Sequence, residues 1–172
     1  MFIGHLPAGY LLGRALRRRL GLSAWFGWEL VGSVFPDIDL LWFYTLGHHK
    51  TLHHKYFTHL PWYWVLVSLA WYTLWRLSRN DTLRQVGWLF LPNVFCHLFL
   101  DTIVGKIDWL APFSDESVAF FDVPARYHPY ILNYLLHWTF GFEVLIVAWA
   151  AWVFRASRAS SHSPQIPSSA GP

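Results

Sequence analysis

Five mostly apolar stretches run along the chain, and charged residues end or interrupt each of them. They cover residues 1–20, 23–46, 61–75, 86–104 and 131–154. The third stretch has no charge and carries Trp or Tyr at both ends, which is typical of a helix whose ends lie at membrane interfaces. The fifth is long enough to cross the hydrocarbon core at about 1.5 Å per residue. The pattern predicts an all-α fold, a polytopic transmembrane helical bundle of about five helices.

The segments around these stretches complete the predicted organisation. Residues 105–130 are mixed in polarity and contain prolines, so we expect an ordered loop outside the membrane. The chain ends in a Ser- and Pro-rich segment, which indicates a membrane-embedded helical domain at residues 1–156 and a disordered tail at residues 157–172. In the first stretch the apolar residues precede the arginines, the reverse of a cleaved signal peptide, so we expect a retained helix. Its length leaves open whether this helix crosses the membrane fully.

The composition agrees with a membrane protein. Hydrophobic residues make up 55% of the chain and charged residues only 13%, whereas an ordinary soluble domain has about 25% charged residues. The single cysteine, Cys96, excludes an intramolecular disulfide and a cysteine-based zinc cluster. The net charge of +3 comes mostly from arginines at the ends of the apolar stretches. We therefore assign the charge to membrane topology and expect no nucleic-acid partner.

Arginine residues cluster at alternate ends of the apolar stretches and predict an orientation. Positive charge accumulates on the cytoplasmic side of a membrane protein, so the arginine-rich side should be cytoplasmic. That side would carry Arg14, Arg17, Arg18, Arg19, Arg76, Arg79, Arg84, Arg155 and Arg158, and the other side only Lys50, Lys55, Lys106 and Arg126. We expect a multi-pass protein of the inner (plasma) membrane with a cytoplasmic carboxyl terminus and residues 47–59 and 105–130 facing out.

With this orientation, histidine and aspartate residues from four separate segments gather near the outer face of the membrane. They are His5, Asp37, Asp39, His53, His54, His59, His97 and Asp101. Because arginine alone determines the orientation, their convergence is an independent observation.

A shared metal ion would explain this convergence. His97 and Asp101 are four residues apart, so both project from one helix face and can bind one ion. Asp37 and Asp39 follow Pro36, which disrupts a helix, and supply further oxygen ligands. An unpaired carboxylate in a membrane costs roughly 2.5–3.5 kcal/mol, and coordination removes that cost. Imidazole and carboxylate ligands without a thiolate suit Zn²⁺, Mn²⁺ or Fe²⁺.

Each part of this set also has a simpler explanation. The His–Asp spacing fits a structural hydrogen-bonded pair, the two aspartates fit a solvated turn, and the histidine-rich segment fits an exposed pH-sensitive loop. His137 is a further candidate ligand near the outer end of the last helix. Glu29 and Glu143 lie within apolar stretches, and we expect them to pair with neighbouring helices.

Five short motifs occur in an order that is shared with a known family. They are Gly4-His5-Leu6-Pro7-Ala8-Gly9, Pro36-Asp37-Ile38-Asp39, His54-Lys55-Tyr56-Phe57-Thr58-His59, His97-Leu98-Phe99-Leu100-Asp101 and Trp109-Leu110-Ala111-Pro112-Phe113-Ser114. The set resembles the bacterial and archaeal YdjM-like inner-membrane proteins, described as membrane-bound metal-dependent hydrolases. The resemblance covers residues 4–114. That family is in turn distantly similar to zinc-dependent phospholipase C and P1 nuclease, an analogy of fold rather than of function.

The resemblance implies a metal site and identifies its ligands. Zn²⁺ is the expected ion, with Mn²⁺ or Fe²⁺ as alternatives, and His54 is selected over His53. The implied metal ligands are His5, Asp37, Asp39, His54, His59, His97 and Asp101. The sequence departs from the family pattern at Lys55, Leu60 and Leu40, which affects contacts with a substrate more than the ligands.

Together these observations predict a metal-dependent hydrolase of a phosphoester or lipid-linked substrate, in contact with membrane lipids. Asp37 or Asp39 would take the proton of a metal-activated water, and Lys55 or Lys106 would hold an anionic head group. Two other classes stay open. One is a metal ion or proton transporter whose path is lined by Glu29 and Glu143. The other is a non-catalytic scaffold that keeps the metal for folding.

Overall fold

The computed structural model describes residues 3–24, 27–45, 55–129 and 131–161. These residues form helices and loops, with one isolated antiparallel bridge between Ile107 and Val118 and no strand among them. The helical elements are α1 (His5–Leu20), α2 (Gly27–Val34), η1 (Phe35–Ile38), α3 (Asp39–Thr45), η3 (Phe57–His59), α4 (Pro61–Ser78), α5 (Asp81–Asp101), α6 (Ile131–Leu135) and α7 (Phe140–Ser161). The predicted all-α fold is confirmed.

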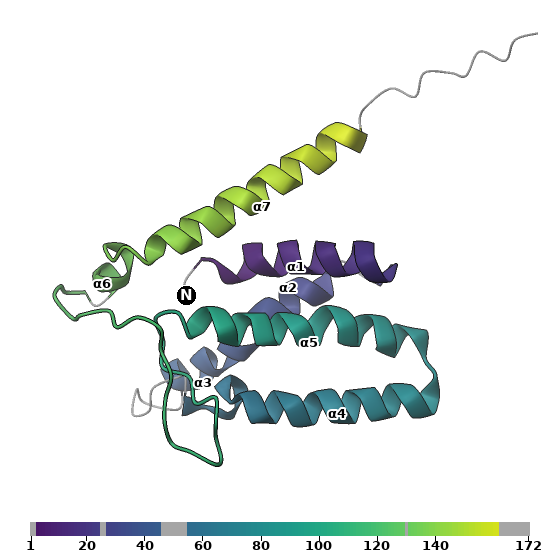
Figure 1. The fold of residues 1–172 in the computed structure, drawn as a ribbon, viewed down its shortest axis with the longest axis horizontal. Helices are drawn as coiled ribbons and strands as arrows, with labels where there is room; N and C mark the ends of the chain where they lie inside the picture. Colours follow the sequence, from purple (N-terminus) through teal and green to yellow (C-terminus); the bar gives the residue numbers. More distant parts are fainter. Residues whose placement is uncertain (1–2, 25–26, 46–54, 130, 162–172) are drawn as a thin grey trace, which may run out of the picture.

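Helix α5 lies at the centre of the arrangement. It contacts α1, α2 and α4, while α7 contacts α1 and runs obliquely away from the other helices (Figure 1). The ends of α1 and α4 and the start of α5 lie at one side of the molecule, and the carboxyl end of α5 lies at the other (Figure 1). The arginines of α1, α4 and α5 therefore share one side, as their alternation along the chain predicts.

The second apolar stretch does not form one continuous helix. It divides into α2, the 3-10 turn η1 and the short helix α3. Pro36 lies at the start of η1 and has no N–H to donate to the preceding turn, so the helix cannot continue through it. This break brings η1 into contact with α5 and η3, and it places the following aspartates beside both elements.

Close packing of α2 on α5 depends on Gly32. A Cβ atom at this position would overlap the carbonyl oxygen of Phe90 in α5. The backbones can approach this closely because glycine has no side chain. Helix α2 leads directly into η1, so this contact sets the distance between η1 and α5.

The two glutamates of the apolar stretches are both engaged, as expected. Glu29 is fully buried in α2 and accepts two hydrogen bonds from the Arg17 guanidinium of α1, at 2.9 and 2.7 Å. Glu143 in α7 accepts the backbone N–H groups of Ile3 and Gly4, at 2.5 and 3.0 Å. These contacts fasten α1 to α2 at one end and to α7 at the other.

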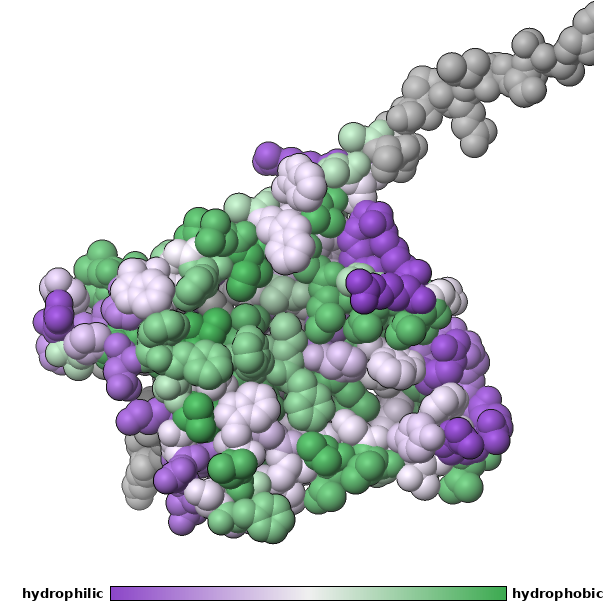
Figure 2. Space-filling model, in the orientation of Figure 1, coloured by the Kyte–Doolittle hydropathy of each residue, from purple (hydrophilic) through white to green (hydrophobic). Residues whose placement is uncertain are grey.

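Among the described residues, one helix is long and apolar enough to cross a membrane, the segment Phe140–Ala159 of α7, with a mean hydropathy of 1.4. The remaining crossings of the predicted five-helix topology stay predictions. Figure 2 shows hydrophobic side chains over the middle of one face and hydrophilic ones gathered toward its two ends.

Helix α7 continues to Ser161, so the predicted start of the tail at residue 157 falls inside a helix, and residues 162–172 lie outside the described part of the chain.

The loop that follows α5 is ordered against the end of that helix, as predicted. The Trp109 indole donates to the Thr102 hydroxyl at 2.8 Å, and the N–H of Phe120 donates to the Thr102 carbonyl at 2.8 Å. Lys55 ties the segment before η3 to the same loop through both carboxylate oxygens of Asp108, at 2.9 and 2.8 Å. Although burial raises the pKa of Asp108, its bonds to Lys55 and Ser117 outweigh this effect and lower the pKa below its usual value.

Replacing Gly32 tests the close approach of α2 to α5. We expect Gly32→Ala to destabilise the protein by about 1–3 kcal/mol, because the added methyl group must push the two backbones apart. The matched control is Gly141→Ala in α7, where a Cβ atom meets nothing within 4 Å. Thermal unfolding of the detergent-purified variants measures the difference. Equal unfolding temperatures for the two variants would contradict the packing described above.

Candidate metal centre

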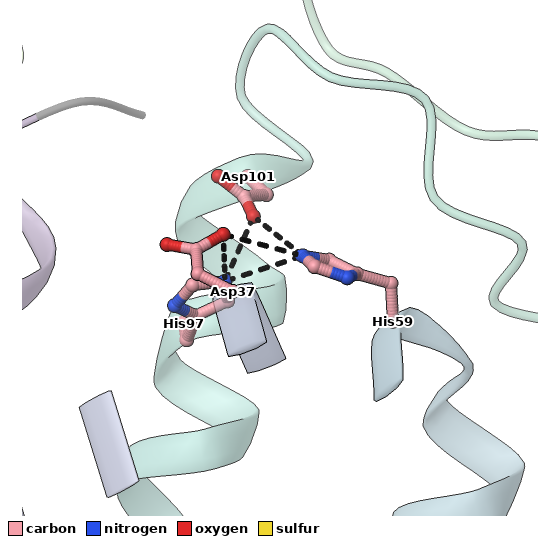
Figure 3. A group of neighbouring side chains, drawn as sticks. All are labelled: Asp37, His59, His97 and Asp101. Carbon is pink, nitrogen blue, oxygen red and sulfur yellow. Dashed lines mark hydrogen bonds and ion pairs between the residues drawn. The ribbon is translucent and has the colours of Figure 1, made fainter. Parts of the chain in front are cut away.

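Four side chains from three elements converge near the carboxyl end of α5 (Figure 3). Asp37 comes from η1, His59 from η3, and His97 and Asp101 from α5. One donor atom of each lies within 4.8 Å of the donor atoms of the other three. Three of the four residues are buried, and Asp37 is partly exposed. We call this set the four-ligand group.

Local structure positions each member of the group. His97 and Asp101 are one helical turn apart, so their side chains lie on the same face of α5. Asp37 lies in the turn that Pro36 imposes after α2. His59 lies two residues before Pro61, where α4 begins, and the Trp64 indole holds the preceding turn by donating to the Thr58 carbonyl at 2.7 Å.

The spacing of the donor atoms suits tetrahedral coordination. His97 Nε2 lies 3.0 Å from Asp101 Oδ2 and 3.6 Å from Asp37 Oδ1. His59 Nε2 lies 3.5 Å from Asp101 Oδ2, 3.7 Å from Asp37 Oδ1 and 3.4 Å from His97 Nε2. Ligands bound to Zn²⁺ at about 2.0–2.1 Å in a tetrahedron lie about 3.3–3.4 Å apart. The observed separations scatter around this value, so a cation at the centre needs only small adjustments.

The hydrogen bond made by Nδ1 of each imidazole explains why the two Nε2 atoms face one another. His97 Nδ1 lies 2.8 Å from the carbonyl oxygen of Ser33, which can only accept, so Nδ1 carries the proton. His59 Nδ1 lies 2.6 Å from Asp39 Oδ2 and donates in the same way. In the neutral form of each ring, Nε2 therefore presents a lone pair to the centre of the group. A bound cation requires this arrangement, in which two nitrogen lone pairs face each other between two carboxylates.

Without a cation, a proton takes its place on His59. Burial lowers the pKa of His59, but its hydrogen bonds to Asp101 and Asp39 and the charges of these carboxylates outweigh burial and raise the pKa to about 9. At neutral pH the cation-free group therefore holds an imidazolium at His59. A metal ion in this group would have to displace this proton.

Asp39 supports the group from behind His59. Its Oδ2 accepts from His59 Nδ1 and from the Thr58 hydroxyl, both at 2.6 Å, and the residue is 5% exposed. Its other oxygen, Oδ1, is buried and has no hydrogen-bond partner within the described ranges. A carboxylate in this position fixes the orientation of a ligating imidazole and makes it a stronger ligand. The structure therefore places Asp39 next to the four-ligand group rather than within it.

His5 contacts the group from α1. Its ring stacks on His97 with centroids 3.9 Å apart, and its Nε2 lies 3.2 Å from Asp101 Oδ1, the carboxylate oxygen that the four-ligand group does not use. Of the seven predicted ligands, four thus converge, and His5 and Asp39 each contact members of that group. The seventh, His54, lies outside the described residues.

Two further predicted residues are engaged elsewhere. His137 Nδ1 lies 2.8 Å from the Thr139 hydroxyl, within the turn between α6 and α7. Lys55, predicted to hold an anionic head group, is paired with Asp108. Ser33 and Thr58 support the group as well, and the sequence patterns do not indicate either role. Thr58 could be suspected because it precedes His59, whereas the Ser33 contact uses a backbone carbonyl and leaves no signal in the residue type.

Loss of a ligand should be distinguishable from loss of a supporting residue. We expect His97→Ala to reduce Zn²⁺ affinity by more than the roughly 10–100-fold effect of a supporting side chain, because it removes a direct donor. His137→Ala, which lies outside the four-ligand group, is the control and should bind Zn²⁺ as wild type does. Metal content after dialysis against buffered Zn²⁺ measures the affinity. Wild-type binding by His97→Ala would refute the site.

Asp39→Asn tests whether Asp39 binds the metal directly or only orients the His59 ring. Because Asp39 acts through His59, we expect the substitution to weaken Zn²⁺ binding by about 10–100-fold while a saturating concentration restores full occupancy. The same titration as for His97→Ala measures it. A loss as large as that of His97→Ala would instead identify Asp39 as a direct ligand.

Comparison with known proteins identifies the family of the chain. A search of curated proteins finds no match, and a search of solved structures finds none either, so the predicted distant likeness to phospholipase C and P1 nuclease stays a prediction. Residues 1–161, nearly the whole chain, match the family described as YdjM inner membrane protein. The match confirms the resemblance seen in the motifs, and the chain belongs to the YdjM inner membrane protein family.

Proposed function

We propose that this protein is a membrane-bound metal-dependent hydrolase that acts on a phosphoester or lipid-linked substrate at the outer face of the membrane. The observation that carries the proposal is the unequal exposure of the four-ligand group. His59, His97 and Asp101 are buried, whereas 31% of the Asp37 side chain is exposed. A site that is enclosed on three sides and open at one carboxylate can admit both water and a substrate.

A divalent cation in this group would activate a water molecule and polarise a phosphoryl oxygen. The two imidazoles and Asp101 hold the centre of the group from buried positions, with Asp39 and the Ser33 carbonyl keeping the rings oriented. Asp37 is the carboxylate nearest the opening, so its second oxygen accepts the proton of the attacking water. The water oxygen would form the new bond to phosphorus, the ester P–O bond would break, and the leaving oxygen would take up the proton that Asp37 received from the water.

Zn²⁺ is the ion we propose first, because its preferred bond lengths match the donor spacing. Mn²⁺ or Fe²⁺ would use the same imidazole and carboxylate donors with additional positions open to water. Four protein ligands alone would close a tetrahedral zinc site, so catalysis with Zn²⁺ requires Asp37 to loosen or a fifth position to open.

The proposed location rests on the arginines. The arginine-bearing ends of α1, α4 and α5 lie on one side of the molecule, and the four-ligand group lies near the opposite end of α5 (Figure 1). If the arginine side is cytoplasmic, the group lies toward the outer leaflet, where lipid-linked phosphoesters present their head groups.

Transport is less well supported. The two glutamates on which that alternative depends are bound to the Arg17 guanidinium and to the N–H groups before α1. Neither is available to pass a cation along a path without breaking these contacts. The scaffold alternative would use the same four-ligand group. Hydrolysis of a substrate by the purified protein distinguishes the hydrolase from the scaffold.

A hydrolysis screen tests the proposed function. Purified protein with added Zn²⁺ or Mn²⁺ should hydrolyse at least one member of a panel of phospholipids and soluble phosphoesters. Asp37→Asn should lower turnover by about 10²–10⁴-fold, the range for loss of a general base, when measured at saturating metal. The control is Asp115→Asn, an exposed carboxylate in the loop after α5. Metal binding without hydrolysis of any substrate would favour the scaffold.

A further inference from the structure

An apolar groove lies between α4 and α5, apart from the metal centre. Its volume is about 420 Å³, within the range of small-molecule sites. Large aromatic and aliphatic side chains make most of its walls, among them Trp71, Trp88, Leu91 and Phe95. Phe95 and His97 are two residues apart on α5, so they point to nearly opposite sides of the helix. The groove and the four-ligand group therefore occupy different faces of α5.

Specific contacts keep this groove in shape. Trp71 of α4 reaches across to α5, where its indole N–H donates to the Leu83 carbonyl at 2.8 Å. A Cβ atom at Gly87 would come within 2.6 Å of the indole nitrogen, so glycine leaves the space that Trp71 occupies. The groove is thus built by a cross-helix hydrogen bond and a close approach.

The groove ends at a cluster of positive charge. Arg84 lines the groove, and the Arg76 guanidinium lies over the ring of Tyr72, another lining residue, 5.8 Å from its centroid. Arg84 Nε and Nη2 contact Asp81 at 2.8 and 2.7 Å, which leaves Nη1 without a partner among the described residues. Two arginines and one aspartate give this end of the groove a net positive charge. Tyr72 and Trp75, which also line the groove, are the aromatic types that favour the membrane interface.

We propose that this groove binds one acyl chain of an anionic phospholipid, whose phosphate lies at Arg84. The apolar walls match a hydrocarbon chain, and the arginine end matches a negative head group. Both features lie on the arginine-rich side of the molecule, so the lipid would belong to the leaflet opposite the metal centre. The proposal rests on membership of an inner membrane protein family and is independent of the proposed hydrolysis.

Native mass spectrometry of the detergent-purified, metal-loaded protein tests this site. We expect a one-lipid adduct with dioleoyl phosphatidylglycerol, formed about fivefold more readily than with dioleoyl phosphatidylcholine, the factor for one basic side chain near an anionic lipid. Glycerol phosphate, which has the head-group charge without acyl chains, should not bind. Equal adducts with both lipids would overturn the proposed head-group contact.

Two substitutions locate the adduct. Ser68→Phe fills the groove from α4 and should abolish it, whereas Ala70→Phe places the same ring on the exposed surface of α4 and should not. Arg84→Gln should remove the preference for the anionic lipid, and the exposed Arg18→Gln on α1 should keep it. Retained Zn²⁺ binding shows that each variant is folded. If folded Ser68→Phe formed as much lipid adduct as the wild type, lipid binding in the groove would be refuted. A wild-type dimer that carries no lipid would refute it as well.

Discussion

The structure depends on the mutual orientation of two imidazole rings. Each ring donates its Nδ1 proton outward, one to Asp39 and the other to the Ser33 carbonyl, and each presents Nε2 to a common point. The two Nε2 atoms lie 3.4 Å apart, between the carboxylates of Asp37 and Asp101. Such a group is unfavourable in a low-dielectric interior unless a proton or a cation lies within it. A proton on His59 or a metal ion at the common point would each relieve this cost, and the donor geometry suits the metal ion.

Helix packing keeps this group together, although its members are far apart in the chain. Helix α5 supplies two of the four residues, and the turn that carries Asp37 is held against α5 by the close contact of α2 at Gly32. His59 arrives on a short turn whose position is fixed by the packing of α4 on α5. A small displacement of either helix would therefore be transmitted to the distance between donor atoms, because close-packed helices transmit strain.

Sequence patterns were sufficient for the helical class and for most of the metal centre. The spacing of His97 and Asp101 specified one helix face, and Pro36 correctly indicated where the chain bends to bring in Asp37. The patterns could not separate Asp37 from Asp39, since both are carboxylates in one turn, and only the fold shows that Asp39 lies behind His59. They also could not reveal the backbone contacts that orient the rings. The number of membrane crossings stays a prediction, because the arginine pattern locates helix ends but not spans. Of the helices in the described part of the chain, α7 alone is both long and apolar enough to cross a membrane.

Helix α7 is joined to the rest of the protein in a way that links it to the metal centre. It is long and apolar enough to cross a membrane, and only 11% of its apolar segment is buried, so most of its surface is free to face lipid. Yet Glu143, near its start, accepts the N–H groups of Ile3 and Gly4, directly before the His5 ring that stacks on His97. Tilting of this helix with bilayer thickness would therefore pull on the imidazole stack. If α7 spans the membrane, these contacts would carry a change in bilayer thickness to the buried polar centre.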